Sequence, residues 1–305
     1  MPETTRPTLG RRRFLVAAGA GAVALAAGGA VAVRELPVRR WWQDLTGACG
    51  EPGPVPPVAS ATIRDGSFRS ATVQVAVGYA VAFPPGHREG DPLPVAVMLP
   101  GRGGTGQDTM RSTLLPDFVA QAVTERGTPA FGLACVDGGD SYWHLRADGE
   151  DRTAMLVDEF LPLVASRHGL GARGRPRAVV GWSMGGYGAI LVGEQHPELF
   201  AGVAAASAAV FLTYDEVLGV GSDAFDSAED FAAHDVVAGA PRLAGTLVRI
   251  DCGRADPFFA NDQALADALP EAPSGEWFEG CHTSESWRVV APGQVDFLGA
   301  ALAGA

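Results

Sequence analysis

The sequence predicts an α/β protein with one doubly wound, mostly parallel sheet and helices on both of its faces. Strand-like and helix-like segments alternate from about residue 92 to residue 303, and this alternation is typical of successive βα units. The chain has 305 residues, 47% of them hydrophobic, which is enough for one large core or two small ones. Ligands of such sheets bind at the carboxyl ends of the strands, so functional residues are expected there.

The individual elements follow from apolar periodicity and from turn residues. Residues 69–77 and 78–86 are expected to form a hairpin at the edge of the sheet. Further strands are expected at 92–99, 129–137, 177–182, 200–207, 247–251 and 275–280, and helices at 108–127, 153–169, 184–197, 261–270 and 287–303. Residues 209–245 show no clear pattern, and we interpret them as a cap insertion over the cleft.

Residues 1–32 are typical of an export signal. An arginine cluster at residues 11–13 precedes a stretch without charges that begins at Phe14 and contains the small residues Ala30-Val31-Ala32. Its R-R-x-F-L arrangement resembles a bacterial twin-arginine signal, so we expect the twin-arginine export machinery as a partner and an extracellular or cell-envelope location. The alternative is an uncleaved anchor, which the many Ala and Gly residues disfavour. No stable membrane anchoring is expected after cleavage.

The remainder divides into a Pro- and Gly-rich lead-in at 33–66 and a catalytic domain at 67–305. The formal net charge is −12 and the chain has no basic stripe, which argues against nucleic acid and anionic membranes as partners.

Four cysteines, an even number, can pair in an oxidising compartment. Cys252 and Cys281 end neighbouring strand-to-loop turns, so a Cys252–Cys281 disulfide would brace two loops, with two buried free thiols as the alternative. Cys49 with Cys135 would then tie the lead-in to the sheet. None of the four shows C-x-x-C spacing or a neighbouring His pattern, so no metal is expected. No cofactor is expected either.

The strongest local motif is Gly181-Trp182-Ser183-Met184-Gly185, which follows one expected strand and opens the next helix. In this context G-x-S-x-G predicts a nucleophile elbow. The turn is tight enough that side chains two residues on either side of Ser183 would collide. The alternative is a glycine-rich turn with an idle serine.

A nucleophilic serine needs a base, and the base needs an orienting acid. His282 follows the last expected strand and is the predicted base, whereas His196 lies at the far end of the elbow helix and His234 lies in the stretch without pattern. Asp256 is the predicted acid because its loop position gives it freedom to reach His282. The alternative acid, Asp251, ends the strand itself.

Residues 101–106 spell G-x-G-x-x-G after a strand-like run, which is also the pattern of a dinucleotide-binding loop. That interpretation requires the first βα unit and an acidic residue about 20 positions later, at the end of the next strand, and the sequence provides neither. We interpret the loop as half of an oxyanion hole. The backbone N–H groups of Arg102 and Met184 are the predicted donors.

From about residue 68 to 303 the chain resembles the esterase-D-like branch of the α/β-hydrolases, which includes S-formylglutathione hydrolases, feruloyl and acetyl xylan esterases, and mycolyltransferases. The matching stretches are LPGRGG (99–104), GWSMGG (181–186), DCGRADPFF (251–259) and GCH (280–282). The resemblance implies Ser183 as nucleophile, Asp256 as acid and His282 as base. The chain has Pro100 where many esterases have His and mycolyltransferases have an acidic residue, and the latter also use a Glu as the triad acid.

Four aromatic residues are expected to line the cleft: Tyr142, Trp143, Trp182 and Trp287. For Tyr142 and Trp143, ordinary packing is the alternative. The expected function is a secreted serine carboxylic-ester hydrolase acting on a small-molecule, glycan or lipid ester. Its alternatives are an acyltransferase to a sugar or lipid alcohol and a non-catalytic binding protein on the same scaffold.

Overall fold

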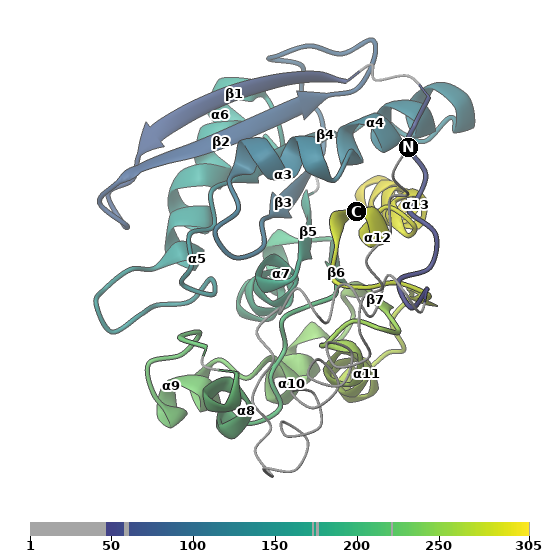
Figure 1. Ribbon diagram of the computed structural model, residues 1–305. Coiled ribbons are helices and arrows are strands. Elements are labelled where there is room, and N and C mark those ends of the chain that lie inside the picture. The colour runs from purple at the N-terminus through teal and green to yellow at the C-terminus, as the bar shows by residue number, and fades with distance from the viewer. Residues whose placement is uncertain (1–46, 58–60, 173, 175–176, 221, 305) are drawn as a thin grey trace, which may run out of the picture.

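The computed structural model describes residues 47–57, 61–172, 174, 177–220 and 222–304. The predicted export signal at residues 1–32 lies outside these residues. Eight strands form one sheet in the order β1-β2-β4-β3-β5-β6-β7-β8 (Figure 1). They are β1 (Thr62–Arg69), β2 (Ala76–Phe83), β3 (Val95–Leu99), β4 (Gly132–Val136), β5 (Arg177–Trp182), β6 (Gly202–Ala206), β7 (Leu247–Gly253) and β8 (Trp277–Phe278).

Strands β3 to β8 are parallel to one another, whereas β1 and β2 are antiparallel and extend the sheet beyond β4. The α-helices are α3 (Gly106–Ser112), α4 (Leu115–Gln121), α5 (Arg152–Ala154), α6 (Leu161–His168), α7 (Met184–Gln195), α8 (Tyr214–Gly219), α9 (Ala228–Ala233), α10 (Val236–Gly239), α11 (Phe259–Ala268), α12 (Ser284–Trp287) and α13 (Ala291–Ala303). The π-helical segments Ala122–Arg126 and Met155–Phe160 continue α4 and join α5 to α6. The predicted α/β architecture is confirmed. None of the helices in the described ranges is long and apolar enough to cross a membrane.

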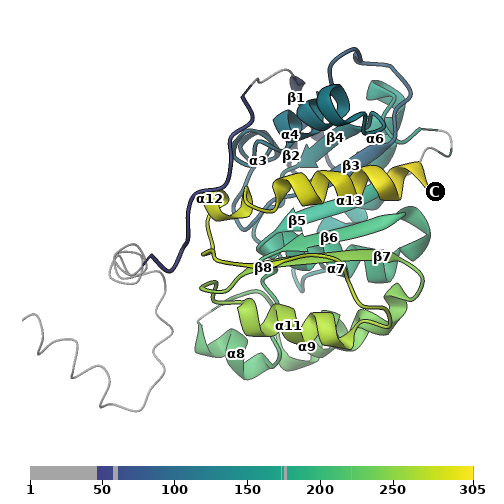
Figure 2. The same ribbon diagram turned by 90° about the vertical axis from the view of Figure 1, so that its right-hand side faces the viewer.

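The sheet has a hydrophobic core on each face because alternate strand residues point to opposite sides. Along β3, Val95, Val97 and Leu99 belong to the core under α6 and α7, whereas Ala96 and Met98 belong to the core under α3, α4 and α13. Figure 2 shows α13 on one face of the sheet and α7 and α11 on the other. Burial on both faces accounts for the continuous apolar runs of these strands.

The predicted edge hairpin begins in the wrong place. Residues 70–75 form the turn of the hairpin, and β1 precedes them at Thr62–Arg69. The carboxylate of Glu159 accepts hydrogen bonds from the backbone N–H groups of Ala71 and Thr72, at 3.0 and 2.8 Å. Glu159 comes 88 residues after Ala71, so local sequence does not reveal this turn.

The predicted helix at 108–127 is also interrupted. Helix α3 ends at Ser112, and α4 begins at Leu115 after Leu114, whose φ of 55° is left-handed. Pro116, in the first turn of α4, has no N–H to donate to an earlier helical carbonyl. A new helix therefore starts there.

Helix α7 contains a buried carboxyl group, Glu194, which is 3% exposed. Neither of its side-chain oxygens has a hydrogen-bond partner among the described residues. Burial raises the pKa of Glu194 from its ordinary 4.5 to about 9, so the group is neutral at pH 7. The folded state therefore binds a proton that the unfolded state has released, and the free energy of unfolding falls as pH rises from 4.5 to about 9.

We predict that Glu194→Gln removes this pH dependence, because the amide keeps the shape of the side chain and cannot ionise. The variant should be more stable than the wild type at pH 8 by at least about 2 kcal/mol, and the difference should shrink toward pH 5. Urea unfolding at several pH values measures the difference in free energy of unfolding between the two proteins. Glu198→Gln, at a side chain 68% exposed, is the control. Parallel pH profiles for Glu194→Gln and the wild type would contradict the interpretation.

Candidate active site

Ser183 lies in the tight turn between β5 and α7, with φ 56° and ψ −125°. A non-glycine residue at positive φ costs about 1–3 kcal/mol and persists only where its surroundings fix it. The backbone of Ser183 is held on both sides: its N–H donates to the carbonyl of Ala206 at 3.1 Å, and its own carbonyl accepts from Tyr187 and Ala209 at 3.1 and 2.9 Å. The turn is therefore anchored to both α7 and the segment after β6.

The two glycines of the motif are required by close backbone contacts. A β-carbon on Gly181 would lie 2.0 Å from the carbonyl oxygen of Gly185. A β-carbon on Gly185 would lie 1.9 Å from the carbonyl oxygen of Leu99. Any side chain at either position would force β3, β5 and α7 apart.

Three polar side chains from separate loops form one hydrogen-bonded chain. The Nε2 atom of His282 lies 2.9 Å from Oγ of Ser183, and its Nδ1 atom lies 2.8 Å from Oδ2 of Asp256. Because Nδ1 faces a carboxylate, the neutral imidazole carries its proton there, and Nε2 is left to accept the hydroxyl proton of Ser183. Asp256 is buried, and its other oxygen accepts from the N–H of Phe258 at 3.0 Å.

The alternative acid, Asp251, is used elsewhere. Its carboxylate accepts two hydrogen bonds from the guanidinium of Arg249, at 2.8 and 2.7 Å, and a third from Gln294 at 3.2 Å. Complete burial nevertheless raises the pKa of Asp251 to about 6. The Asp251 carboxylate is bonded to Arg249 and Gln294 and makes no hydrogen bond to His282.

The glycine loop after β3 lies against the serine. Residues 101–104 form a turn in which the N–H of Gly104 donates to the carbonyl of Gly101 at 2.9 Å, and Gly103 has the left-handed φ of 68° that such a turn needs. A β-carbon on Gly101 would lie 3.4 Å from Cβ of Ser183. Within the described ranges, the backbone N–H groups of Arg102 and Met184 donate to no protein atom. Both are free to bind an anion.

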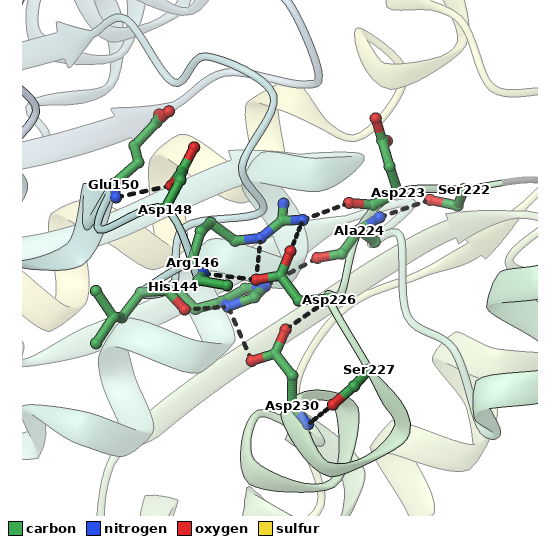
Figure 3. A network of polar contacts seen from close by, with 12 residues as sticks. His144, Arg146, Asp148, Glu150, Ser222, Asp223, Ala224, Asp226, Ser227 and Asp230 are labelled. Carbon is green, nitrogen blue, oxygen red and sulfur yellow. Dashed lines mark hydrogen bonds and ion pairs between the residues drawn. The ribbon is translucent and has the colours of Figure 1, made fainter.

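Two loops beside this site are joined by charged groups (Figure 3). Arg146 donates to both carboxylate oxygens of Asp226, at 3.2 and 2.8 Å, and to the carbonyl of Asp223 at 2.8 Å. The guanidinium of Arg146 holds the pKa of Asp226 down at about 2. The side chain of Arg102 reaches the same segment through a 2.5 Å hydrogen bond to Asp223. The loop after β4 and the segment before α9 are thus tied together and to the glycine loop.

The structure corrects three of the four predicted cleft aromatics. Trp143 is fully buried, and Trp182 lies in the core on the α13 face of the sheet. Tyr142 is 6% exposed and packs against Tyr187 and Phe225. Tyr142 and Trp143 both have positive φ, 55° and 59°, and the loop turns their rings inward.

Trp287 is the aromatic that lies at the site. It is half-buried, and its ring meets that of His282 edge-on, with centroids 5.2 Å apart. Its Nε1 donates to Oγ of Ser207 at 2.9 Å. Sequence reasoning missed Ser207, and also Phe258, whose ring centroid lies 5.6 Å from that of His282. The only sequence signal for Phe258 was its place two residues after Asp256.

The predicted disulfide pairing was wrong. Cys281 is bonded to Cys49, and neither the Cys252–Cys281 pair nor the Cys49–Cys135 pair forms. Cys135 and Cys252 are buried free thiols. Cys252 lies inside the sheet with its sulfur 3.9 Å from Oγ of Ser207, while Cys281 lies in the loop that contacts the lead-in.

Among the described residues, one cluster brings three metal-ligand side chains together: His144, Asp230 and His234. The two imidazole rings are stacked, with centroids 4.3 Å apart and planes 29° from parallel. A metal ion lies close to the plane of each imidazole that binds it, so stacked rings do not share one well. His144 is also engaged, with Nε2 2.9 Å from the carbonyl oxygen of Ala224. We interpret the cluster as packing between the loop after β4 and the end of α9.

The arrangement of sheet, elbow and histidine loop is that of an α/β-hydrolase. A comparison with protein families matches residues 70–288 to the family described as "Putative esterase", and the chain belongs to this family. No curated protein is significantly similar to the chain in sequence.

Solved structures confirm the α/β-hydrolase fold. A ferulic acid esterase superposes with a TM-score of 0.69 at 18% identity, over 80% of this chain and 99% of that one. An S-formylglutathione hydrolase from Agrobacterium tumefaciens superposes with a TM-score of 0.63 at 16% identity, over 79% of this chain and 96% of that one. MPT51 of Mycobacterium tuberculosis superposes with a TM-score of 0.61 at 16% identity, over 80% of this chain and 100% of that one. At these identities the likeness establishes the fold alone.

We predict that Gly185→Ala disrupts the protein, because its new β-carbon would overlap the carbonyl of Leu99. The free energy of unfolding should fall by about 3 kcal/mol or more, or the protein should fail to accumulate. Thermal unfolding measures it. Gly219→Ala is the matched control, since nothing lies within 4 Å of a β-carbon there, and it should change stability by less than about 1 kcal/mol. Equal melting temperatures for the two variants would contradict the close contact.

Proposed function

We propose that the protein is an exported serine carboxylic-ester hydrolase. The observation that carries the proposal is the continuous hydrogen-bonded chain from Oγ of Ser183 through both nitrogens of His282 to Asp256. The family and the fold support an esterase or acyltransferase activity. The Cys49–Cys281 disulfide is compatible with an oxidising compartment and therefore with export.

In the proposed acylation step, Oγ of Ser183 attacks the ester carbonyl carbon while Nε2 of His282 takes the hydroxyl proton. The carbonyl oxygen becomes an alkoxide that accepts hydrogen bonds from the N–H groups of Arg102 and Met184. Asp256 holds the imidazole in the productive tautomer and stabilises its positive charge. The intermediate then collapses: the bond to the alcohol oxygen breaks, and His282 gives its proton to that oxygen. The product of this step is an ester of Ser183.

Deacylation repeats these steps with water as the nucleophile. The water oxygen attacks the acyl carbon while His282 takes a proton from the water. His282 then returns this proton to Oγ of Ser183 as the free acid leaves. An alcohol entering in place of water would yield a new ester, which is the acyltransferase alternative. Assays with a sugar alcohol as acceptor separate the two, because one reaction yields free acid and the other yields acylated alcohol.

A fluorophosphonate probe tests the proposal, since it reacts with activated serines and not with ordinary ones. We predict that the wild type is labelled on Ser183 and that Ser183→Ala is not labelled. Hydrolysis of p-nitrophenyl acetate by the variant should fall by about 10³-fold or more. Ser166→Ala, at an exposed serine on α6, is the control and should keep full labelling. A folded wild type that takes up no probe would overturn the proposal.

A further inference from the structure

The loop that carries His282 has little regular structure to hold it. It lies between β8, which has two residues, and α12, which has four. On one side it is hydrogen-bonded to the loop that carries Asp256: the N–H groups of Arg254 and Ala255 donate to the carbonyls of Phe278 and Gly280, at 2.8 and 3.0 Å. These bonds hold the loop up to Gly280, two residues before His282.

On its other side the loop meets residues 47–57, which we call the strap. Cys49 is covalently bonded to Cys281, the residue directly before His282. The N–H of Gly53 donates to the carbonyl of Glu285 at 2.8 Å. Figure 2 shows the strap, in dark purple, passing beside α12. The strap therefore contacts the chain both immediately before and shortly after His282.

Two glycines let the strap lie this close. A β-carbon on Gly50 would lie 2.6 Å from the carbonyl oxygen of Glu279, and a β-carbon on Gly53 would lie 2.2 Å from the backbone nitrogen of Val289. Gly53 is buried, although the residues on both sides of it are exposed. The contact between strap and histidine loop is therefore backbone against backbone.

We propose that the strap is a positioning segment for His282, acting through the Cys49–Cys281 bond and the Gly53 contact. The proposal rests on the proposed function, because it assigns a role in that reaction. A base displaced by about 1 Å from its nucleophile can lose about 10²-fold in rate. The strap holds the backbone on either side of His282 through Cys281 and Glu285, and neither of these two contacts involves the reacting atoms. Removing the strap contacts should slow the chemical step and leave substrate binding nearly unchanged.

The test compares variants by steady-state kinetics with p-nitrophenyl acetate and by the rate of fluorophosphonate labelling, below the unfolding temperature of each protein. Cys49→Ser should lower kcat by about tenfold or more per labelled active site and change KM by less than about twofold. A Cys49→Ser and Cys281→Ser double variant should behave in the same way. Val55→Ala, at a strap side chain 63% exposed, is the control and should match the wild type.

Gly53→Ala provides a second variant that keeps the disulfide. Its β-carbon would push the strap away from Val289. We therefore expect kcat to fall again while KM stays nearly unchanged. Folded Cys49→Ser and Gly53→Ala proteins with wild-type kcat per active site would overturn the role of the strap. That result differs from failure of the proposed function, in which the wild type itself would take up no probe.

Discussion

The structure depends on the approach of three backbone segments around Ser183. The end of β3, the turn after β5 and the first residues of α7 lie in direct contact, because Gly181 and Gly185 have no side chains to separate them. This contact places the glycine loop after β3 beside the serine. It also places the start of α7, with its unpaired N–H groups, at the same point. One steric constraint therefore assembles both the nucleophile and the predicted anion site.

The other half of the site is held differently. Ser183 is fixed by the central strands of the sheet, whereas Asp256 and His282 lie on loops at the end where β7 pairs with the short β8. These loops are held by each other and by the strap. Two aromatic rings, Phe258 and Trp287, also contact the imidazole. The half built on the central strands thus carries the nucleophile, and the half that carries the base depends on contacts from distant parts of the chain.

This division explains what the sequence could predict. Strands β3 to β6 are mostly apolar runs that apolar periodicity and turn residues identify, and the motif around Ser183 is defined by local sterics. The types and chain order of the other two side chains pointed to Asp256 and His282, and the structure brings all three within hydrogen-bond distance.

Two of the errors concern contacts between distant residues, whereas the break at Leu114 in the predicted helix at 108–127 is local. The turn at 70–75 is held by Glu159, and the partner of Cys281 is set by the path of the lead-in. The rings of Tyr142 and Trp143 turn inward because two successive residues take positive φ, which their identities do not suggest. The role of Trp287 depends on Ser207, which lies 80 residues away in the chain. Local patterns contain no information about such pairs.

The central claim is that the glycine loop and the start of α7 form an anion site for the alkoxide formed on Ser183. A crystal structure of the protein after reaction with a fluorophosphonate tests it most directly, because the phosphoryl oxygen stands in for the alkoxide. The account predicts phosphorus bonded to Oγ of Ser183 and the phosphoryl oxygen within about 3.1 Å of the backbone nitrogens of Arg102 and Met184. An adduct whose phosphoryl oxygen points away from both nitrogens would contradict it.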